Sequence, residues 1–227
     1  MKFVHKVFHL EKDLERQVFV DDINQYLSKY SEELNTKTYG ISSQDEYVEF
    51  INNNPSFNLD PRGYNLHNEQ GWRYGEVGIW ASNWTAWNNF LNSDYDCLIL
   101  MEDDISYNQE YMSLLIRYIN ELPADWEIFH YFAPSSESHK YNEEMSININ
   151  ISKIYQDWSC ACYIINKSGA EKLLRIAANG INLPLDWFMF RQSALFNIYT
   201  IKPSAKTGCS INQVDSTFQV TQVRKVL

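Results

Sequence analysis

The most informative hydrophobic pattern in the chain is an unbroken apolar run, Cys97 to Met101, that ends in the acids Glu102, Asp103 and Asp104. A short continuous apolar run of this kind predicts a strand that is buried on both faces. The acids then lie at the carboxyl end of that strand, where the chain leaves the core. Ligands bind at this edge in open α/β sheets. We therefore expect a functional site at the end of this strand.

Apolar periodicity elsewhere predicts strands that alternate with helices, which is typical of an α/β fold. Strands are expected at 3–10, 126–132, 159–165 and 198–201, helices at 11–30, 44–51, 75–91 and 108–122, a further helix opened by a capping box at 168–171, and a helix or turn at 183–187. The rest of residues 31–72 is polar and irregular, and so long a segment is expected to line a site or to move. Residues 134–152 are interpreted as a mobile loop that closes over a ligand.

The helix expected at 75–91 has one strongly apolar face. The residues on this face recur at helical spacing and indicate a side that faces the core: Val77, Trp80, Ala81, Trp84, Trp87 and Leu91. Three polar residues, Glu76, Ser82 and Asn83, lie off the stripe. We therefore consider them candidates for ligand contact.

Length and charge narrow the class of protein. The 227 residues fit a single domain, 1–227. A formal net charge of −10 and a pI of about 4.9 argue against nucleic acid or an anionic membrane surface as a partner. No stretch approaches about 18 apolar residues, and the N-terminus lacks the apolar core of a signal peptide, so we expect no membrane span and a cytoplasmic location. The four cysteines are expected to be reduced, structural thiols.

The three acids point to metal chemistry. Because side chains alternate along an extended chain, Glu102 and Asp104 are expected on one side and Asp103 on the other. Two carboxylates on one side repel each other unless a cation or a shared proton relieves the repulsion. Hard oxygen ligands favour Mg²⁺ or Mn²⁺ over zinc. The alternative interpretation is a solvated acidic turn that only ends the strand.

Four segments of the chain also fit a known pattern when taken in order. They are the strand–turn His9–Arg16, the Gly-Glu-x-Gly helix start Gly75–Asn83, the acidic strand end Leu98–Asp104, and the late strand–helix block Cys162–Leu174 with Pro184–Asp186. Together they resemble glycosyltransferase family 25, the lipooligosaccharide and procollagen galactosyltransferase-like proteins. The chain departs from this family's pattern at Asn83, where the family commonly has histidine, and residues 31–72 match nothing in it.

The resemblance implies a GT-A-like α/β fold, in which a central mixed, mostly parallel sheet is flanked by helices and a nucleotide sugar binds at the strand ends. The implied enzyme is a metal-dependent hexosyltransferase. It would move a hexose, galactose or glucose, from a UDP-sugar to a hydroxyl of a glycan or protein acceptor, with inversion at the sugar carbon.

Individual residues receive roles from the resemblance. Glu102 and Asp104 would hold Mn²⁺ or Mg²⁺, which neutralises the departing diphosphate. Asp186, the only acid between residues 172 and 214, would accept the proton of the acceptor hydroxyl. From its position alone, Asp186 is equally an acid that stabilises the start of a helix. Contacts to the donor are expected from three further side chains, Glu76, Ser82 and Asp103.

Two other functions compete with the transferase. A carboxylate–metal hydrolase, either a nuclease or a phosphatase, would require further acids on the neighbouring strands. A catalytically inactive, glycosyltransferase-like module that binds sugar or nucleotide is favoured by the departure at Asn83. Turnover separates the module from the transferase, because a module binds UDP or glycan and releases no UDP from a UDP-sugar.

Overall fold

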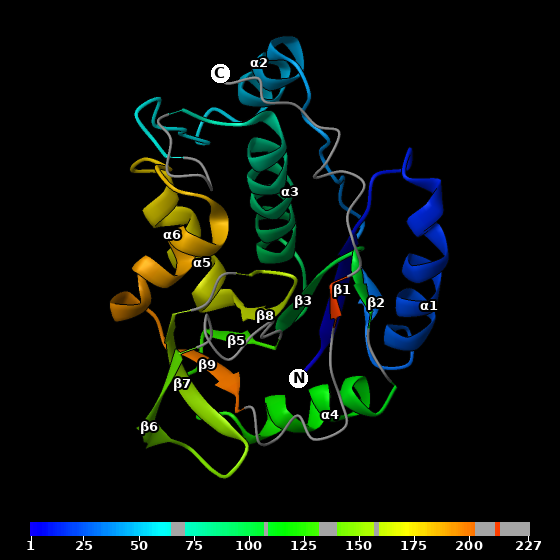
Figure 1. Ribbon diagram of the computed structural model, residues 1–227, viewed down its shortest axis with the longest axis vertical. Helices are drawn as coiled ribbons and strands as arrows, with labels where there is room; N and C mark the ends of the chain where they lie inside the picture. Colours follow the sequence, from blue (N-terminus) through cyan, green and yellow to red (C-terminus); the bar gives the residue numbers. More distant parts are fainter. Residues whose placement is uncertain (65–70, 107–108, 132–139, 157–158, 203–211, 214–227) are drawn as a thin grey trace.

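The computed structural model describes residues 1–64, 71–106, 109–131, 140–156, 159–202 and 212–213 (Figure 1). An eight-stranded sheet runs through the centre in the order β2-β1-β3-β8-β5-β9-β7-β6. Its strands are β1 (Phe3–Phe8), β2 (Glu32–Glu33), β3 (Cys97–Glu102), β5 (Ile128–His130), β6 (Lys140–Ser146), β7 (Ile151–Gln156), β8 (Cys162–Asn166) and β9 (Ile198–Ile201). A separate pair joins β4 (Ile105–Ser106) to β10 (Asn212–Gln213).

The sheet is mixed, as the sequence predicts, but parallel pairs do not dominate it. β1 is parallel to β2 and β3, and β5 is parallel to β9. β8 runs antiparallel to β3 and β5, and β7 runs antiparallel to β9 and β6. The expectation of a mostly parallel sheet is corrected in this respect. The reason is that β8 follows β5 through the β6–β7 hairpin rather than through a crossover helix, and so returns against it.

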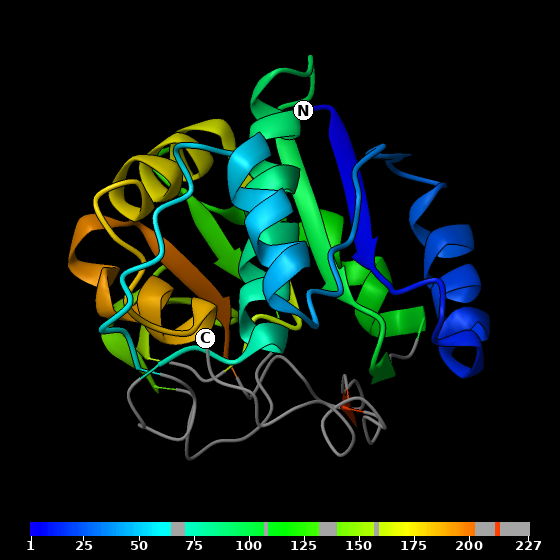
Figure 2. The ribbon, with the colours of Figure 1, turned by 90° about the horizontal axis from the view of Figure 1, so that it is seen from above.

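Helices cover both faces of the sheet (Figure 2). The helices of the first face are α2 (Gln44–Asn53), α3 (Tyr74–Leu91), α5 (Lys167–Ala177) and α6 (Leu185–Arg191). Those of the second face are α1 (Gln17–Leu27) and α4 (Gln109–Glu121), and two short 3₁₀ turns, η1 (Leu14–Arg16) and η2 (Ser193–Leu195), complete the set in the described ranges. None of these helices has the length and apolar character that crossing a membrane requires.

The central strand β3 confirms the prediction of a strand buried on both faces. Leu98 and Leu100 pack in the core on the side of α3, whereas Ile99 and Met101 pack in the core on the side of α1 and α4. None of these four side chains is more than 1% exposed. An apolar residue is therefore required at each of these positions, which explains why the run shows no polar alternation before Glu102.

Helix α3 confirms the helix predicted at 75–91 and the burial of its tryptophan stripe, but the polar residues Glu76, Ser82 and Asn83 off the stripe are buried as well. Trp80 and Trp87 are fully buried, and Trp80 contacts the Phe188 ring of α6 edge-on at 5.0 Å between ring centroids. The indole N–H of Trp80 donates to the Leu183 carbonyl at 3.0 Å. These contacts fix the start of α6 against α3.

The interpretation of 134–152 as a mobile loop was wrong for residues 140–146 and 151–152. Residues 140–146 and 151–156 form the hairpin β6–β7 at the edge of the sheet. Ile151 and Ile154 are buried on it, while Glu143 and Glu144 are exposed. An edge strand with a solvated face has many polar residues, and this polar composition led to the prediction of a loop in place of a strand. Residues 134–139 lie outside the described ranges.

The capping box predicted at 168–171 is also corrected. Helix α5 begins at Lys167, and its cap is Asn166, whose side-chain oxygen accepts from the Gly169 N–H at 2.9 Å. The Ser168 hydroxyl instead donates to Glu127 at 3.0 Å. Both serine and asparagine are good caps, and the β8 register decides between them by ending the strand at Asn166.

Candidate functional site

The parallel register of β1 and β3 brings two distant parts of the chain together at one edge of the sheet. Phe8, the last residue of β1, pairs with Glu102, the last residue of β3. The residues that follow, His9 and Asp103, meet beyond the strand ends, where His9 Nδ1 lies 2.7 Å from Asp103 Oδ2. The acids predicted from the apolar run therefore stand beside the end of the first strand.

A tight turn after β1 returns Arg16 to the same point. The Asp13 N–H donates to the Leu10 carbonyl at 2.7 Å, and the 3₁₀ turn that follows ends at Arg16. Arg16 Nη1 donates to Asp103 Oδ1 at 2.7 Å. Asp103 is only 7% exposed, and each of its oxygens has its own partner, Arg16 on one and His9 on the other. A buried ion pair with both oxygens satisfied orients the groups that form it.

Glu102 lies among several negative charges. Burial, and then the charges of Asp104, Asp186 and Asp103 in that order, together raise the pKa of its carboxyl to about 8, while Arg16 opposes them. The structure thus brings the acidic strand end within electrostatic reach of Asp186, although the two are far apart in the sequence. This proximity joins the two sets of acids that the sequence singled out separately.

Asp186 is fixed at the first turn of α6. Pro184 precedes the helix as its N-cap, and Asp186 Oδ1 accepts from the Trp187 N–H at 2.8 Å. The helix-start interpretation therefore describes part of what this acid does. Its influence on the pKa of Glu102 shows that the carboxylate also belongs to the acidic centre formed by Glu102, Asp103, Asp104 and Asp186.

The carboxylates of the acidic centre suit a hard divalent cation only if other ligands complete its coordination. Within the described ranges, no group of three or more His, Cys, Asp or Glu side chains has the geometry of a complete metal site. Mg²⁺, however, is usually held by one or two carboxylates together with substrate phosphates and water, not by an all-protein cage. The mutual repulsion around Glu102 is the condition that a cation relieves. These carboxylates therefore fit the kind of cation site that is shared with a phosphate-bearing ligand.

Comparison with known families identifies the kind of protein that carries this centre. The model of glycosyltransferase family 25 (LPS biosynthesis protein) matches residues 49–189, which is more than half of the chain. The chain belongs to glycosyltransferase family 25. The resemblance inferred from four short segments is therefore confirmed, and the match extends into the 31–72 region that those segments left out.

Curated relatives of this family 25 chain are similar over half of its length. Human procollagen galactosyltransferase 2 is 25% identical over 120 residues, which cover 51% of this chain and 19% of the relative. Procollagen galactosyltransferase 1 of Danio rerio is 24% identical over 119 residues, with 51% and 20% covered. The chain thus spans about one fifth of the length of these relatives.

A solved structure supports the fold. The Drosophila β-1,4-galactosyltransferase 7, solved with manganese, UDP-Gal and xylobiose, superposes with a TM-score of 0.50 at 12% sequence identity. The match covers all of this chain and 76% of that chain. At this identity the likeness shows the fold alone, and it confirms the GT-A-like fold predicted for the family 25 chain.

Two of the expected donor contacts, Glu76 and Ser82, lie inside the structure of α3. Ser82 is 2% exposed; its hydroxyl donates to the Gly78 carbonyl and accepts from the Tyr39 N–H, both at 2.8 Å. Glu76 is 7% exposed, and its Oε2 accepts from the Arg73 N–H at 3.3 Å at the helix start. Ser82 in particular anchors a neighbouring segment, so any effect on a ligand would pass through that segment.

Asn83, the departure from the family pattern, is part of a buried hydrogen-bonded chain. The Trp87 indole N–H donates to the Tyr163 hydroxyl at 3.1 Å, and that hydroxyl donates to Asn83 Oδ1. Asn83 Nδ2 in turn donates to the Ile79 carbonyl at 2.9 Å. Asn83 is 3% exposed. The side chain at this position therefore holds α3 to β8.

Sequence reasoning gave no role to His9 or Arg16, which the structure places at the acidic centre. The signal was present, because both residues bound the strand–turn segment that carried the first part of the family resemblance. Only the β1–β3 register shows why the segment matters, since it sets His9 beside Asp103.

Proposed function

We propose that this family 25 chain transfers a hexose from a UDP-sugar to a hydroxyl of a glycan or protein acceptor, with inversion and with Mn²⁺ or Mg²⁺ as cofactor. The observation that supports the proposal is that Glu102 ends β3 beside the Arg16–Asp103 ion pair, where the charges of Asp104 and Asp186 also act on it. Transfer needs acids of two kinds, one set for the diphosphate side and one for the acceptor hydroxyl, and the acidic centre would supply both from separate elements.

Galactose is the hexose that the relatives favour. Two of them are named procollagen galactosyltransferases, and the structural neighbour was solved with UDP-Gal and manganese. These names describe those proteins, and they support UDP-galactose as the first donor to test, with UDP-glucose as the second. A protein or glycan hydroxyl is the corresponding acceptor class.

On the donor side, Glu102 and Asp104 would hold the cation. When bound, the cation supplies neutralisation of the charge on the departing diphosphate. Asp103 contributes indirectly, because it holds Arg16 at the same point. Arg16 Nη2 is buried and has no hydrogen-bond partner within the described ranges. A phosphate oxygen is the natural acceptor for that N–H.

On the acceptor side, Asp186 would take the proton of the attacking hydroxyl as the sugar passes through an oxocarbenium-like state. Its Oδ1 accepts from the Trp187 N–H, which orients the carboxylate. An ionised carboxylate has several acceptor lone pairs, enough to take one proton while it keeps such a bond.

The hydrolase alternative receives little support from neighbouring strands. The acid next to β5, Glu127, precedes that strand and so lies at the edge of the sheet opposite the acidic centre. It is bound by Lys172 and Ser168. Only a turnover measurement separates the transferase from the inactive module that binds sugar or nucleotide.

A thermal-shift titration tests the proposal. UDP with Mn²⁺ is expected to raise the Tm of the wild-type chain, since a ligand at a hundredfold excess over Kd stabilises by about 2.7 kcal/mol. Glu102→Ala and Asp104→Ala are expected to abolish the Mn²⁺-dependent part of the shift. The matched control is Asp94→Ala, an exposed acid in the loop before β3. Release of UDP from UDP-galactose with an acceptor then separates the enzyme from a binding module, and equal Mn²⁺ affinity in wild type and Asp104→Ala would contradict the metal assignment.

A further inference from the structure

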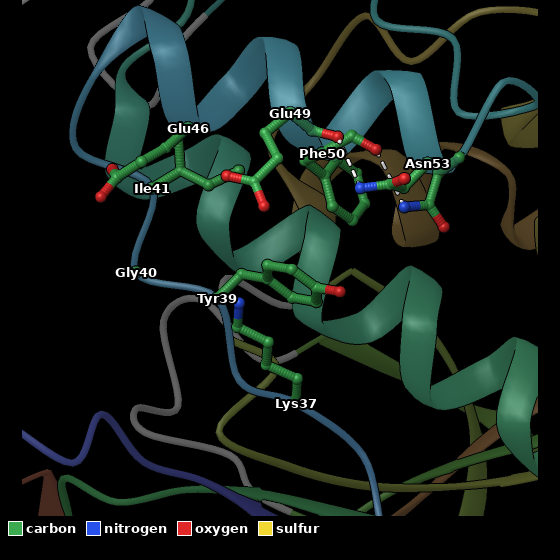
Figure 3. Close-up of a pocket in the computed structure, with 9 residues that line it drawn as sticks. Lys37, Tyr39, Gly40, Ile41, Glu46, Glu49, Phe50 and Asn53 are labelled. Atoms are coloured by element: carbon green, nitrogen blue, oxygen red, sulfur yellow. Dashed lines mark hydrogen bonds between the residues drawn. The ribbon is translucent and has the colours of Figure 1, made fainter.

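A cavity of about 280 Å³, separate from the acidic centre, lies between α2 and the extended segment 37–41 (Figure 3). Its chemically informative lining consists of Lys37, Tyr39, Glu49, Phe50 and Asn53. None of these residues belongs to the acidic centre. The volume is slightly smaller than that of typical ligand pockets, about 300–1,000 Å³, and suits one ring unit of a larger ligand.

The wall of this cavity is held more firmly than a connecting segment requires. The Tyr39 N–H donates to Ser82 at 2.8 Å, and the Thr38 hydroxyl accepts from the His9 N–H at 3.4 Å. α3 approaches the segment so closely that a Cβ on Gly78 would lie 2.6 Å from the Tyr39 carbonyl oxygen. The Gly-Glu-x-Gly-x₃-Ser pattern of α3 thus has a physical purpose here, which is to fix the backbone of Tyr39.

The Tyr39 ring is supported from behind by other aromatic rings. It meets the Phe50 ring edge-on at 4.9 Å between centroids, Phe50 meets Phe57 at 5.0 Å, and Phe57 meets Trp84 of α3 at 5.5 Å. The series runs from the cavity into the core. A ring that is supported in this way is a rigid platform, and binding to it costs little side-chain entropy.

Polar groups of both kinds surround the ring. The Lys37 ammonium lies 4.9 Å from the Tyr39 centroid. Figure 3 shows Lys37 on one side of Tyr39 and α2 on the other, with the Glu49 carboxyl directed from the helix towards the space between them. Asn53 Nδ2 donates to the Glu49 carbonyl at 3.1 Å, which turns its amide along the cavity edge. Donors and acceptors therefore stand on both sides of an aromatic face.

We propose that this cavity is a subsite for a neutral sugar ring of the acceptor glycan. A pyranose presents an apolar C–H face and a rim of hydroxyls that both donate and accept, which matches an aromatic platform between an ammonium, a carboxylate and an amide. The charge balance disfavours the anionic nucleotide, since Glu46 and Glu49 outnumber Lys37 along the lining. The assignment as an acceptor subsite rests on the proposed transferase function.

The position of the cavity fits this assignment. Thr38 contacts His9, and His9 contacts Asp103 of the acidic centre. One residue further along, Tyr39 faces the cavity. Segment 37–41 therefore joins the cavity to the acidic centre through Thr38 and His9.

Binding to an array of neutral mono-, di- and trisaccharides tests the proposal on the labelled full chain. At least one glycan is expected to bind, and Tyr39→Ala and Glu49→Gln are each expected to weaken that binding at least tenfold. The matched controls are Asp45→Asn, an exposed acid of α2, and Tyr30→Ala, an exposed aromatic residue, neither of which lines the cavity. Neither is expected to change the affinity. If Tyr39→Ala does not fold, the test rests on Glu49→Gln, which is expected to fold because Glu49 is exposed.

Three results would overturn the subsite. The first is that no glycan on the array binds, and the second is that wild type and Glu49→Gln bind the glycan with equal affinity. The third is that UDP displaces the glycan and Glu49→Gln also weakens UDP binding, which would make the cavity a nucleotide site. UDP release from UDP-galactose by the wild-type chain is measured separately. Glycan binding without UDP release would support the sugar site and contradict the transferase function. UDP release without glycan binding would support the transferase function and contradict the sugar site.

Discussion

Arg16 and Asp103, 87 positions apart in the chain, form an ion pair in which Arg16 Nη1 lies 2.7 Å from Asp103 Oδ1. Both side chains are almost buried, with about a tenth of each exposed. The three adjacent acids therefore have different surroundings. Asp103 contacts Arg16 and His9, whereas Glu102 and Asp104 lie near other negative charges.

Substitution of neighbouring acids should therefore have opposite effects on stability. Asp103→Ala leaves Arg16 as a buried charge that has lost this partner, and we expect a loss of about 3 kcal/mol in the free energy of unfolding. Asp104→Ala removes a repelling charge, so the stability of the metal-free chain should hold or rise slightly. Urea unfolding of both variants without metal checks the prediction. An equal loss in the two would mean that Asp103 has no special structural role.

Asp186→Asn should separate catalysis from donor binding. The amide keeps the shape of the side chain and an oxygen that accepts the Trp187 N–H, but it cannot take a proton. We expect turnover to fall by roughly 10²–10⁴, as is typical for loss of a general base, while the affinity for UDP and Mn²⁺ hardly changes. Steady-state kinetics and UDP calorimetry on the same preparation provide the two readouts. Near-normal turnover would leave Asp186 with only its role at the helix start.

The raised pKa of Glu102 predicts a pH-dependent stability of the metal-free chain. The carboxyl titrates near 4.5 when unfolded and at about 8 when folded. Between these values the folded state keeps a proton that the unfolded state releases, so stability falls as pH rises through this window, by at most about 1.4 kcal/mol per pH unit. Glu102→Gln should flatten the profile. Denaturant unfolding midpoints, taken at steps of about one pH unit from about pH 5 to about pH 9, measure this profile. A wild-type profile as flat as that of the variant would contradict the prediction.

Asn83→Leu should be costly for stability and nearly neutral for chemistry. It removes the acceptor of the buried Tyr163 hydroxyl, whose pKa burial already holds well above the ordinary value. An unsatisfied buried hydroxyl costs about 1–3 kcal/mol. Tyr163→Phe in the same chain should recover part of the loss, and a double-mutant cycle measures the coupling. Lost turnover in a stably folded Asn83→Leu chain would instead make Asn83 a substrate contact.

The sequence predicts the elements that have strong local patterns. The run from Cys97 to Met101 identifies a strand buried on both faces, and the tryptophan stripe of 75–91 identifies α3, because in both cases apolar burial is written into consecutive or periodic positions. The hairpin β6–β7 was missed because an edge strand hides half of its pattern behind solvated residues such as Glu143.

The candidate site shows a similar division. Glu102, Asp104 and Asp186 can be selected from the sequence because acids are rare at strand ends and in the late part of the chain. The ion pairs of Asp103 could not be predicted, since they depend on which strand lies beside β3 and in what register. Ser82 and Asn83 were placed off the apolar stripe correctly, but the segments that cover them come from residue 39 and from β8.

The same pairing of β1 with β3 governs how the chain reaches its folded state. His9 and Asp103 are 94 positions apart, and the two strands that carry them are parallel. Closing a loop of this length loses entropy before any native contact compensates for it, and parallel pairing across such a distance is intrinsically slow. During synthesis at about 5–20 residues per second, β1 must remain without its central partner for several seconds until β3 is made. Refolding should therefore be limited by the docking of β1 onto β3, and the acidic centre does not exist until that step is complete.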